Sequence, residues 1–158
     1  MVTSPYLHVS LLLTVATFGT WTQENWWEQV FSVVPNLLGF SLGGLAIFLG
    51  VGSEQFRSII SGRKPESVEK QSPYLTVAAA LAHFVVVQIL ALLVAIVAAG
   101  AWKLPAIQYG VPDVVNDVAR ILFWLVGYWL FLYSICSAAA ALFGVFRVAS
   151  WFDEARTM

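Results

Sequence analysis

The sequence predicts an all-α integral membrane protein in which four transmembrane helices form one bundle. Of its 158 residues, 59% are hydrophobic and 11% are charged, whereas soluble domains carry about 25% charged residues. Four stretches, 1–23, 29–53, 71–102 and 121–146, contain no Asp, Glu, Lys or Arg. Each is long enough to cross a hydrocarbon core, which needs about 20 helical residues. None alternates polar and apolar residues as a barrel strand does, so we expect helices.

The predicted spans are Tyr6–Trp21, Val33–Val51, Leu75–Ala99 and Ile121–Phe143. The first is the shortest. The residues before it carry no Lys or Arg, which argues against a signal peptide and for a retained span. The connection Thr22–Glu28 is short and acidic, so the first two spans should form a tight helical hairpin.

The other two connections differ in character. The connection Glu54–Ser72 is polar and basic. The connection Lys103–Arg120 contains helix-breaking Pro and Gly residues in its first half. Its second half reads as a helix, which Asp113 could cap and in which Asp117 and Arg120 can form an ion pair.

Basic residues set the predicted orientation. The connection 54–72 carries Arg57, Arg63, Lys64 and Lys70, and the C-terminal tail carries two more, against two on the other side. Cytoplasmic loops are enriched in Lys and Arg, so four spans place both ends in the cytoplasm of a multi-pass inner-membrane protein. The four basic residues could also contact anionic lipid or an acidic cytoplasmic partner. The alternative is that they only set the topology.

Aromatic residues are expected at both membrane interfaces. Trp21, Trp26 and Trp27 cluster at the predicted outer end, and Tyr6 and Tyr74 lie at the inner one. Amphipathic rings prefer the depth of the lipid headgroups, which agrees with the predicted topology. The alternative is that Trp simply follows the high apolar content.

Two spans carry stripes of small residues. In the second span the stripe is Gly39, Gly43, Ala46 and Gly50; in the fourth it is Gly127, Ser134, Ala138 and Ala141. Small residues let another helix approach closely. They predict either an oligomer interface or gate, or packing inside one protomer. The bulky residues Trp124, Phe131 and Leu142 of the fourth span are expected to face lipid.

Four polar residues lie at membrane depth: Asn36, Ser41, His83 and Gln88. Asn36 follows Pro35 and could line a polar opening, but we favour that its amide satisfies the carbonyl freed by the proline. His83 and Gln88 are five positions apart, so they should not form one site. His83 is either a proton- or ligand-binding group or a neutral histidine bonded to a neighbouring helix.

Several function classes are disfavoured. No ionisable Asp, Glu, Lys or Arg lies within a span, unlike in most ion-coupled transporters. The pattern G-x-S-x-G at 39–43 sits in a continuous apolar run without a strand before it, so it is not read as a hydrolase site. The single cysteine, Cys136, excludes pairwise thiol chemistry within the chain. Net charge is −1, which gives no basic field for nucleic acid. The sequence therefore predicts no enzyme, no cofactor and no metal site.

The leading hypothesis is a non-enzymatic membrane subunit that self-associates or scaffolds a larger complex through its small-residue stripes. The first alternative is an oligomeric pore or membrane-perturbing effector, for example in bacterial defence or a stress response. The second is a carrier for a neutral solute, lined by the four polar residues at membrane depth.

Overall fold

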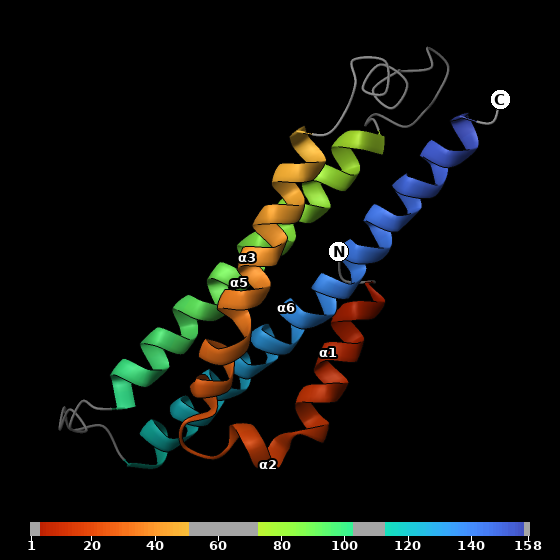
Figure 1. The fold of residues 1–158 in the computed structure, drawn as a ribbon. Coiled ribbons are helices and arrows are strands. Elements are labelled where there is room, and N and C mark those ends of the chain that lie inside the picture. The colour runs from red at the N-terminus through yellow and green to blue at the C-terminus, as the bar shows by residue number, and fades with distance from the viewer. Residues whose placement is uncertain (1–3, 51–72, 103–112, 157–158) are drawn as a thin grey trace.

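The computed structural model describes residues 4–50, 73–102 and 113–156. This part of the chain is helical apart from short turns (Figure 1). The elements, in order, are α1 (Pro5–Ala16), α2 (Phe18–Trp21), α3 (Trp26–Gly50), α5 (Pro73–Trp102) and α6 (Asp113–Arg156).

Three helical segments are long and apolar enough to cross a membrane: Trp26–Ala46, Leu75–Ala101 and Val114–Phe146. This confirms the helical architecture in the described part of the chain and is consistent with a membrane protein. The four-span count is not confirmed, because α1 has 12 residues and is about 18 Å long against a hydrocarbon core of about 30 Å.

The helix α3 begins at Trp26, seven residues before the predicted start of the second span at Val33. The prediction assigned Glu28 to the connection before the span. In the structure Glu28 lies in the first turn of α3, where the positive end of the helix dipole favours a carboxylate. The charge therefore marks the beginning of the helix and does not interrupt it.

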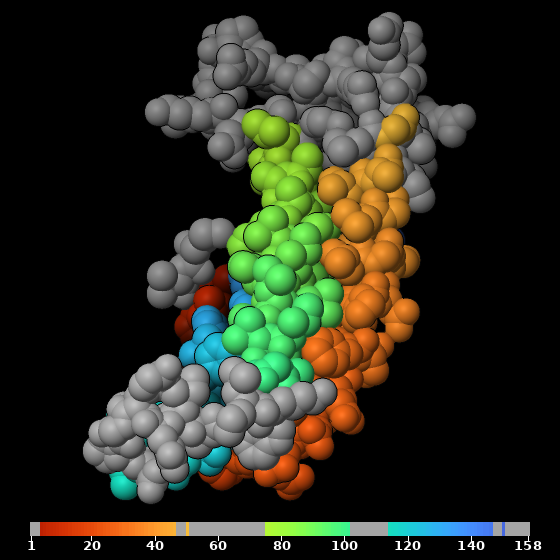
Figure 2. All heavy atoms as spheres, turned by 90° about the vertical axis from the view of Figure 1, so that its left-hand side faces the viewer, coloured from red at the N-terminus to blue at the C-terminus, as the bar shows by residue number. Residues whose placement is uncertain are grey.

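The longest helix, α6, lies at the centre of the arrangement and contacts α1, α2, α3 and α5. The helices α3 and α5 lie side by side along much of their length (Figures 1 and 2). The expected hairpin of the first two spans is wrong, because α1 packs chiefly on α6. There Trp129 Nε1 donates a hydrogen bond to Ser10 Oγ (3.1 Å), which attaches α1 to α6.

A bend at Thr17 separates α1 from α2. The Thr17 hydroxyl donates to the carbonyl oxygen of Leu13 (2.7 Å), and threonine hydroxyls that bond to the preceding turn bend helices. Beyond the bend, Trp21 Nε1 donates to the carbonyl oxygen of Thr14 (2.8 Å). The indole therefore holds α2 back against α1.

The turn into α3 depends on Asn25, which has a φ of 71°. Asparagine tolerates this left-handed conformation better than most residues. The Asn25 carbonyl oxygen accepts a hydrogen bond from the Glu28 backbone N–H (3.0 Å). The turn thus reverses the chain within a few residues and starts α3 with its two tryptophans pointing inward.

The end of the bundle near α2 is closed by a tryptophan cluster. Its buried residues are Trp21, Trp26, Trp27, Val30, Val34, Ala95, Ala98, Trp124, Tyr128 and Phe131. Rings meet edge to face, for example Trp26 with Tyr128 at 5.9 Å and Trp27 with Trp124 at 6.2 Å between centroids. Such geometry is favourable for aromatic pairs.

This cluster corrects two sequence-based expectations. The residues Trp21, Trp26 and Trp27 are buried against protein, so they do not form an exposed belt at the headgroups. Trp124 and Phe131 are also buried and do not face lipid, whereas Leu142 is exposed as expected. The physical reason is helical spacing: Phe131 lies three residues before Ser134, which puts both on the same side of α6.

Toward the other end, packing becomes sparser. A second buried cluster joins Leu81 and Phe84 of α5 to Ala141 of α6. Beyond it, Phe143 and Phe146 of α6 are 66% and 73% exposed, and the end of α6 diverges from α3 and α5 (Figure 1). We call this region the open end.

Candidate functional site

The small-residue stripe of α3 faces away from the rest of the bundle. Gly39, Gly43, Ala46 and Gly50 are all exposed. A Cβ built on Gly39, Gly43 or Gly50 meets no atom within 4 Å. At about 100° per residue, the stripe lies roughly 120° to 180° around the helix from the buried side chains of Val34 and Ser41. Contacts within the described chain therefore do not use the stripe.

Asn36 lies on the same outward face of α3. Its Nδ2 donates to the carbonyl oxygen of Ser32 (3.0 Å), and no described residue donates to its Oδ1. Pro35 frees the carbonyl of Phe31, four residues before it. The favoured prediction that Asn36 satisfies this carbonyl is therefore wrong, because its side chain bonds the carbonyl four residues before its own position. An amide oxygen thus faces outward at membrane depth.

The stripe of α6 is used differently. Gly127 lies against Trp26, and a Cβ built there would come within 2.6 Å of Trp26 Cη2 and 2.9 Å of Val94 Cγ1. Ala141 is buried with Leu81 and Phe84, with Ala138 packed beside them. Ser134 is also buried, and its hydroxyl donates to the carbonyl oxygen of Phe131 (2.7 Å). The structure places these four residues inside the protomer.

Gln88, at the middle of the α5 span, is fully buried. Its Nε2 donates to Ser41 Oγ of α3 (3.3 Å), and the Ser41 hydroxyl donates in turn to the carbonyl oxygen of Leu37. No described residue donates to Gln88 Oε1. The Gln88 amide therefore links α3 to α5 through its nitrogen, and its oxygen has no hydrogen-bond donor among the described residues.

His83 forms a separate contact on the side of α5 that faces α6. Its Nε2 lies 3.4 Å from Tyr133 Oη, and the two rings meet edge to face at 6.4 Å. Tyr133 also stacks on Trp129, at 6.2 Å and 25° between planes. Sequence reasoning missed Tyr133, although a phenol hydroxyl in an uncharged span needs a partner as much as an amide does.

The four polar residues of the carrier hypothesis are thus distributed over three places. Ser41 and Gln88 form one buried pair, His83 binds Tyr133, and Asn36 faces outward. His83 and Gln88 contact different helices, as their five-residue spacing predicts. The basic residues Arg57, Arg63, Lys64 and Lys70 lie outside the described residues.

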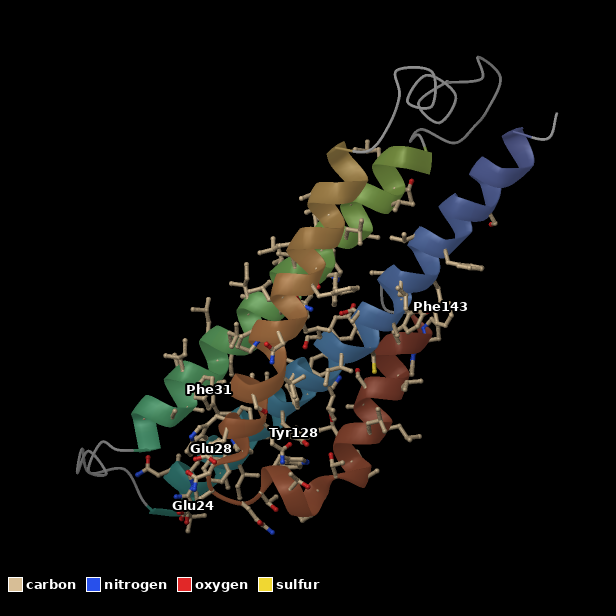
Figure 3. All side chains as sticks on the ribbon, viewed as in Figure 1. Glu24, Glu28, Phe31, Tyr128 and Phe143 are labelled. Atoms are coloured by element: carbon tan, nitrogen blue, oxygen red, sulfur yellow. The ribbon has the colours of Figure 1, made fainter. Side chains whose placement is uncertain are left out.

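Two acidic side chains and one ion pair lie at the end of the bundle that holds the tryptophan cluster. Glu24 and Glu28 are exposed there, at the same end of the bundle as Tyr128 and far from Phe143 (Figure 3). Asp117 and Arg120 form the predicted ion pair (2.9 Å), and the Arg120 guanidinium lies 5.5 Å from the Trp124 ring centroid. Among the described residues, no three His, Cys, Asp or Glu side chains come together as metal ligands would.

Comparison with protein-family models, with curated proteins and with solved structures finds no match for this chain. The functional argument therefore depends on the geometry of the described residues.

Proposed function

We propose that this chain is a non-enzymatic membrane subunit that binds a second copy of itself through the outward face of α3. One observation carries the proposal. Of the two small-residue stripes, the one on α6 is filled by Trp26 and α5, whereas the glycines of α3 have open space where a Cβ would stand. Glycine costs a helix interior about 1 kcal/mol relative to alanine. Three unfilled glycines on one face therefore suggest a contact outside the protomer.

The proposed contact pairs α3 with α3 of the second copy around a two-fold axis, so that each surface residue meets its own equivalent region. The spacing of Gly39 and Gly43 allows two helix backbones to approach closely, which gains dispersion contacts without displacing water. Asn36 lies on the same face, and its Oδ1 would find a donor in the amide of the second copy.

The finer topology belongs to the same proposal. Four basic residues of the connection 54–72 favour a cytoplasmic location for the end of α3, for the start of α5 and for the end of α6, which lie at the same end of the bundle (Figure 1). This orientation makes Glu54–Ser72 the proposed contact for anionic lipid or a cytoplasmic protein. The prediction of four spans places the N-terminus on the same side as the C-terminus, in the cytoplasm. The N-terminus can lie there only if the segment that contains α1 also crosses the membrane, and the length of α1 does not support such a crossing.

Self-association is the preferred hypothesis over the pore and the carrier because a specific surface supports it. The polar residues named for the carrier lie at three places in the described chain. No contact among the described residues favours the pore. Dye leakage from proteoliposomes, or saturable solute uptake, would reverse this preference.

The test compares two leucine substitutions at open glycines. Gly43→Leu puts a bulky side chain in the middle of the proposed contact, and Gly100→Leu puts the same side chain at an open position of α5. We expect the wild type and Gly100→Leu to have the mass of an oligomer in detergent, measured by light scattering after size exclusion, and Gly43→Leu to have the mass of a monomer. An unchanged mass for Gly43→Leu would reject the α3 contact.

A further inference from the structure

We propose that His83 and Tyr133 form a binding site for the carbonyl oxygen of a neutral, lipophilic molecule dissolved in the bilayer. The site is independent of the α3 face. It lies between α5 and α6, and both side chains are only partly buried, so a molecule in the surrounding lipid can reach them.

The position of the pair is deep in the membrane. His83 lies eight residues from Leu75, the nearer end of the α5 span, which corresponds to about 12 Å along the helix axis. It is five residues from the middle of that span, or about 8 Å. Water is absent from this depth, so every hydrogen-bonding group must find its partner in protein or in a dissolved molecule.

A count of protons shows that the pair has a donor to spare. A neutral imidazole carries one N–H and a phenol one O–H, and the single contact between Nε2 and Oη uses one of them. If the Tyr133 hydroxyl donates to Nε2, the imidazole proton is on Nδ1 and that N–H has no acceptor. If Nε2–H donates to Oη, the Tyr133 O–H has no acceptor. In either tautomer one donor remains, and no described residue accepts it.

The surroundings define the chemistry of the ligand. The spare group is a donor, so the ligand must present an acceptor oxygen. The stretches 71–102 and 121–146 carry no Asp, Glu, Lys or Arg, so no countercharge from either span would stabilise an ionised ligand. The stacked rings of Trp129 and Tyr133 adjoin the donor and offer a flat aromatic surface. A carbonyl on a planar apolar group satisfies all three conditions.

Two membrane molecules share this chemistry: a quinone, whose carbonyls are attached to a flat ring, and a phospholipid, whose ester carbonyls lie at the edge of the hydrocarbon. An ester would have to descend several ångströms below its usual depth to reach His83, because the hydrocarbon is about 30 Å thick. The depth therefore favours the quinone-type carbonyl.

The first experiment titrates decylubiquinone into protein held in nanodiscs of ether-linked phospholipid, which has no ester carbonyl, and follows the saturable part of tryptophan quenching. We expect the wild type to bind and the double variant His83→Leu/Tyr133→Phe to bind about tenfold more weakly, which corresponds to one neutral hydrogen bond. Each single variant keeps one donor and should lose only a few-fold. The matched control is His8→Leu/Tyr128→Phe, which removes the same groups elsewhere and should bind like the wild type.

The second experiment omits the quinone and compares melting temperatures in ester-linked and ether-linked phospholipid. If the ester carbonyl is the ligand, the wild type melts higher in ester lipid and the double variant shows no difference, because a ligand stabilises only the state that binds it. The proposal is overturned if the double variant and the control behave alike in both experiments. Should the double variant not fold, unchanged binding by both single variants overturns it equally.

Discussion

The two ends of the bundle use their residues in opposite ways. Near α2, large rings from three parts of the chain fill the interior, and Gly127 beside them leaves the space that Trp26 occupies. Toward the open end, the small residues of α3 face outward, and Phe143 and Phe146 of α6 are exposed. Aromatic packing thus stabilises the fold at the end near α2, whereas the open end exposes surfaces to which a second molecule can bind.

The largest expected effect is the loss of a ring from the tryptophan cluster. Trp26→Ala should lower the free energy of unfolding by about 3 kcal/mol, because it leaves a cavity between α3, α5 and α6. Phe40→Ala removes a ring that is 72% exposed and should change the free energy of unfolding by less than about 0.5 kcal/mol. Unfolding in mixed micelles, followed by circular dichroism, measures both. Equal losses would mean that the cluster does not hold the fold together.

Glycine substitutions should show opposite signs at the two ends. Gly127→Ala forces its new methyl group against Trp26 and Val94. The overpacking should outweigh the better helix propensity of alanine, for a net loss of about 1 kcal/mol. Gly44→Ala, at an open position of α3, should be neutral or raise stability by up to about 1 kcal/mol. A stabilising Gly127→Ala would show that the glycine is not required for the close approach of Trp26.

The buried Ser41–Gln88 pair predicts an asymmetry between its two partners. Ser41→Ala removes the acceptor and leaves the whole Gln88 amide unsatisfied, so it should cost about 1 to 2 kcal/mol. Gln88→Leu removes the unsatisfied oxygen together with the donor and should cost less than about 1 kcal/mol. The same unfolding assay compares them. If Gln88→Leu costs more than Ser41→Ala, the amide makes a further stabilising contact.

The smallest effect is expected at the surface of the tryptophan end. Asp117 and Arg120 are paired but 58% and 46% exposed, and exposed ion pairs contribute about 0 to 1 kcal/mol. Asp117→Asn should lower stability by less than about 0.5 kcal/mol, and the loss should vanish in high salt. A loss that is independent of salt would indicate a contact other than the ion pair.

Charge and hydropathy predicted the helical membrane fold and the approximate position of the three long spans. They failed where polar residues have local functions. Glu28 was assigned to the connection before the second span although it belongs to the first turn of α3. The length of α1 was overestimated because the apolar run continues past the bend at Thr17 into α2.

The candidate sites were predictable only in part. Helical spacing identified both small-residue stripes, but the sequence could not tell which one packs inside the protomer, because that depends on which helix α6 meets. His83 was recognisable as a polar residue at membrane depth. Its partner Tyr133 is 50 residues away, so only the three-dimensional arrangement brings them together.

Disulfide cross-linking along α3 in native membranes tests the central claim most directly. In a Cys136→Ser background, single cysteines are placed at Asn36, Gly39 and Gly43 on the outward face and at Val34 and Ser41 on the buried face. The account predicts that mild oxidation yields covalent dimers from the three outward positions and none from the two buried ones. Dimers from both faces, or from neither, would contradict a specific contact between two copies of α3.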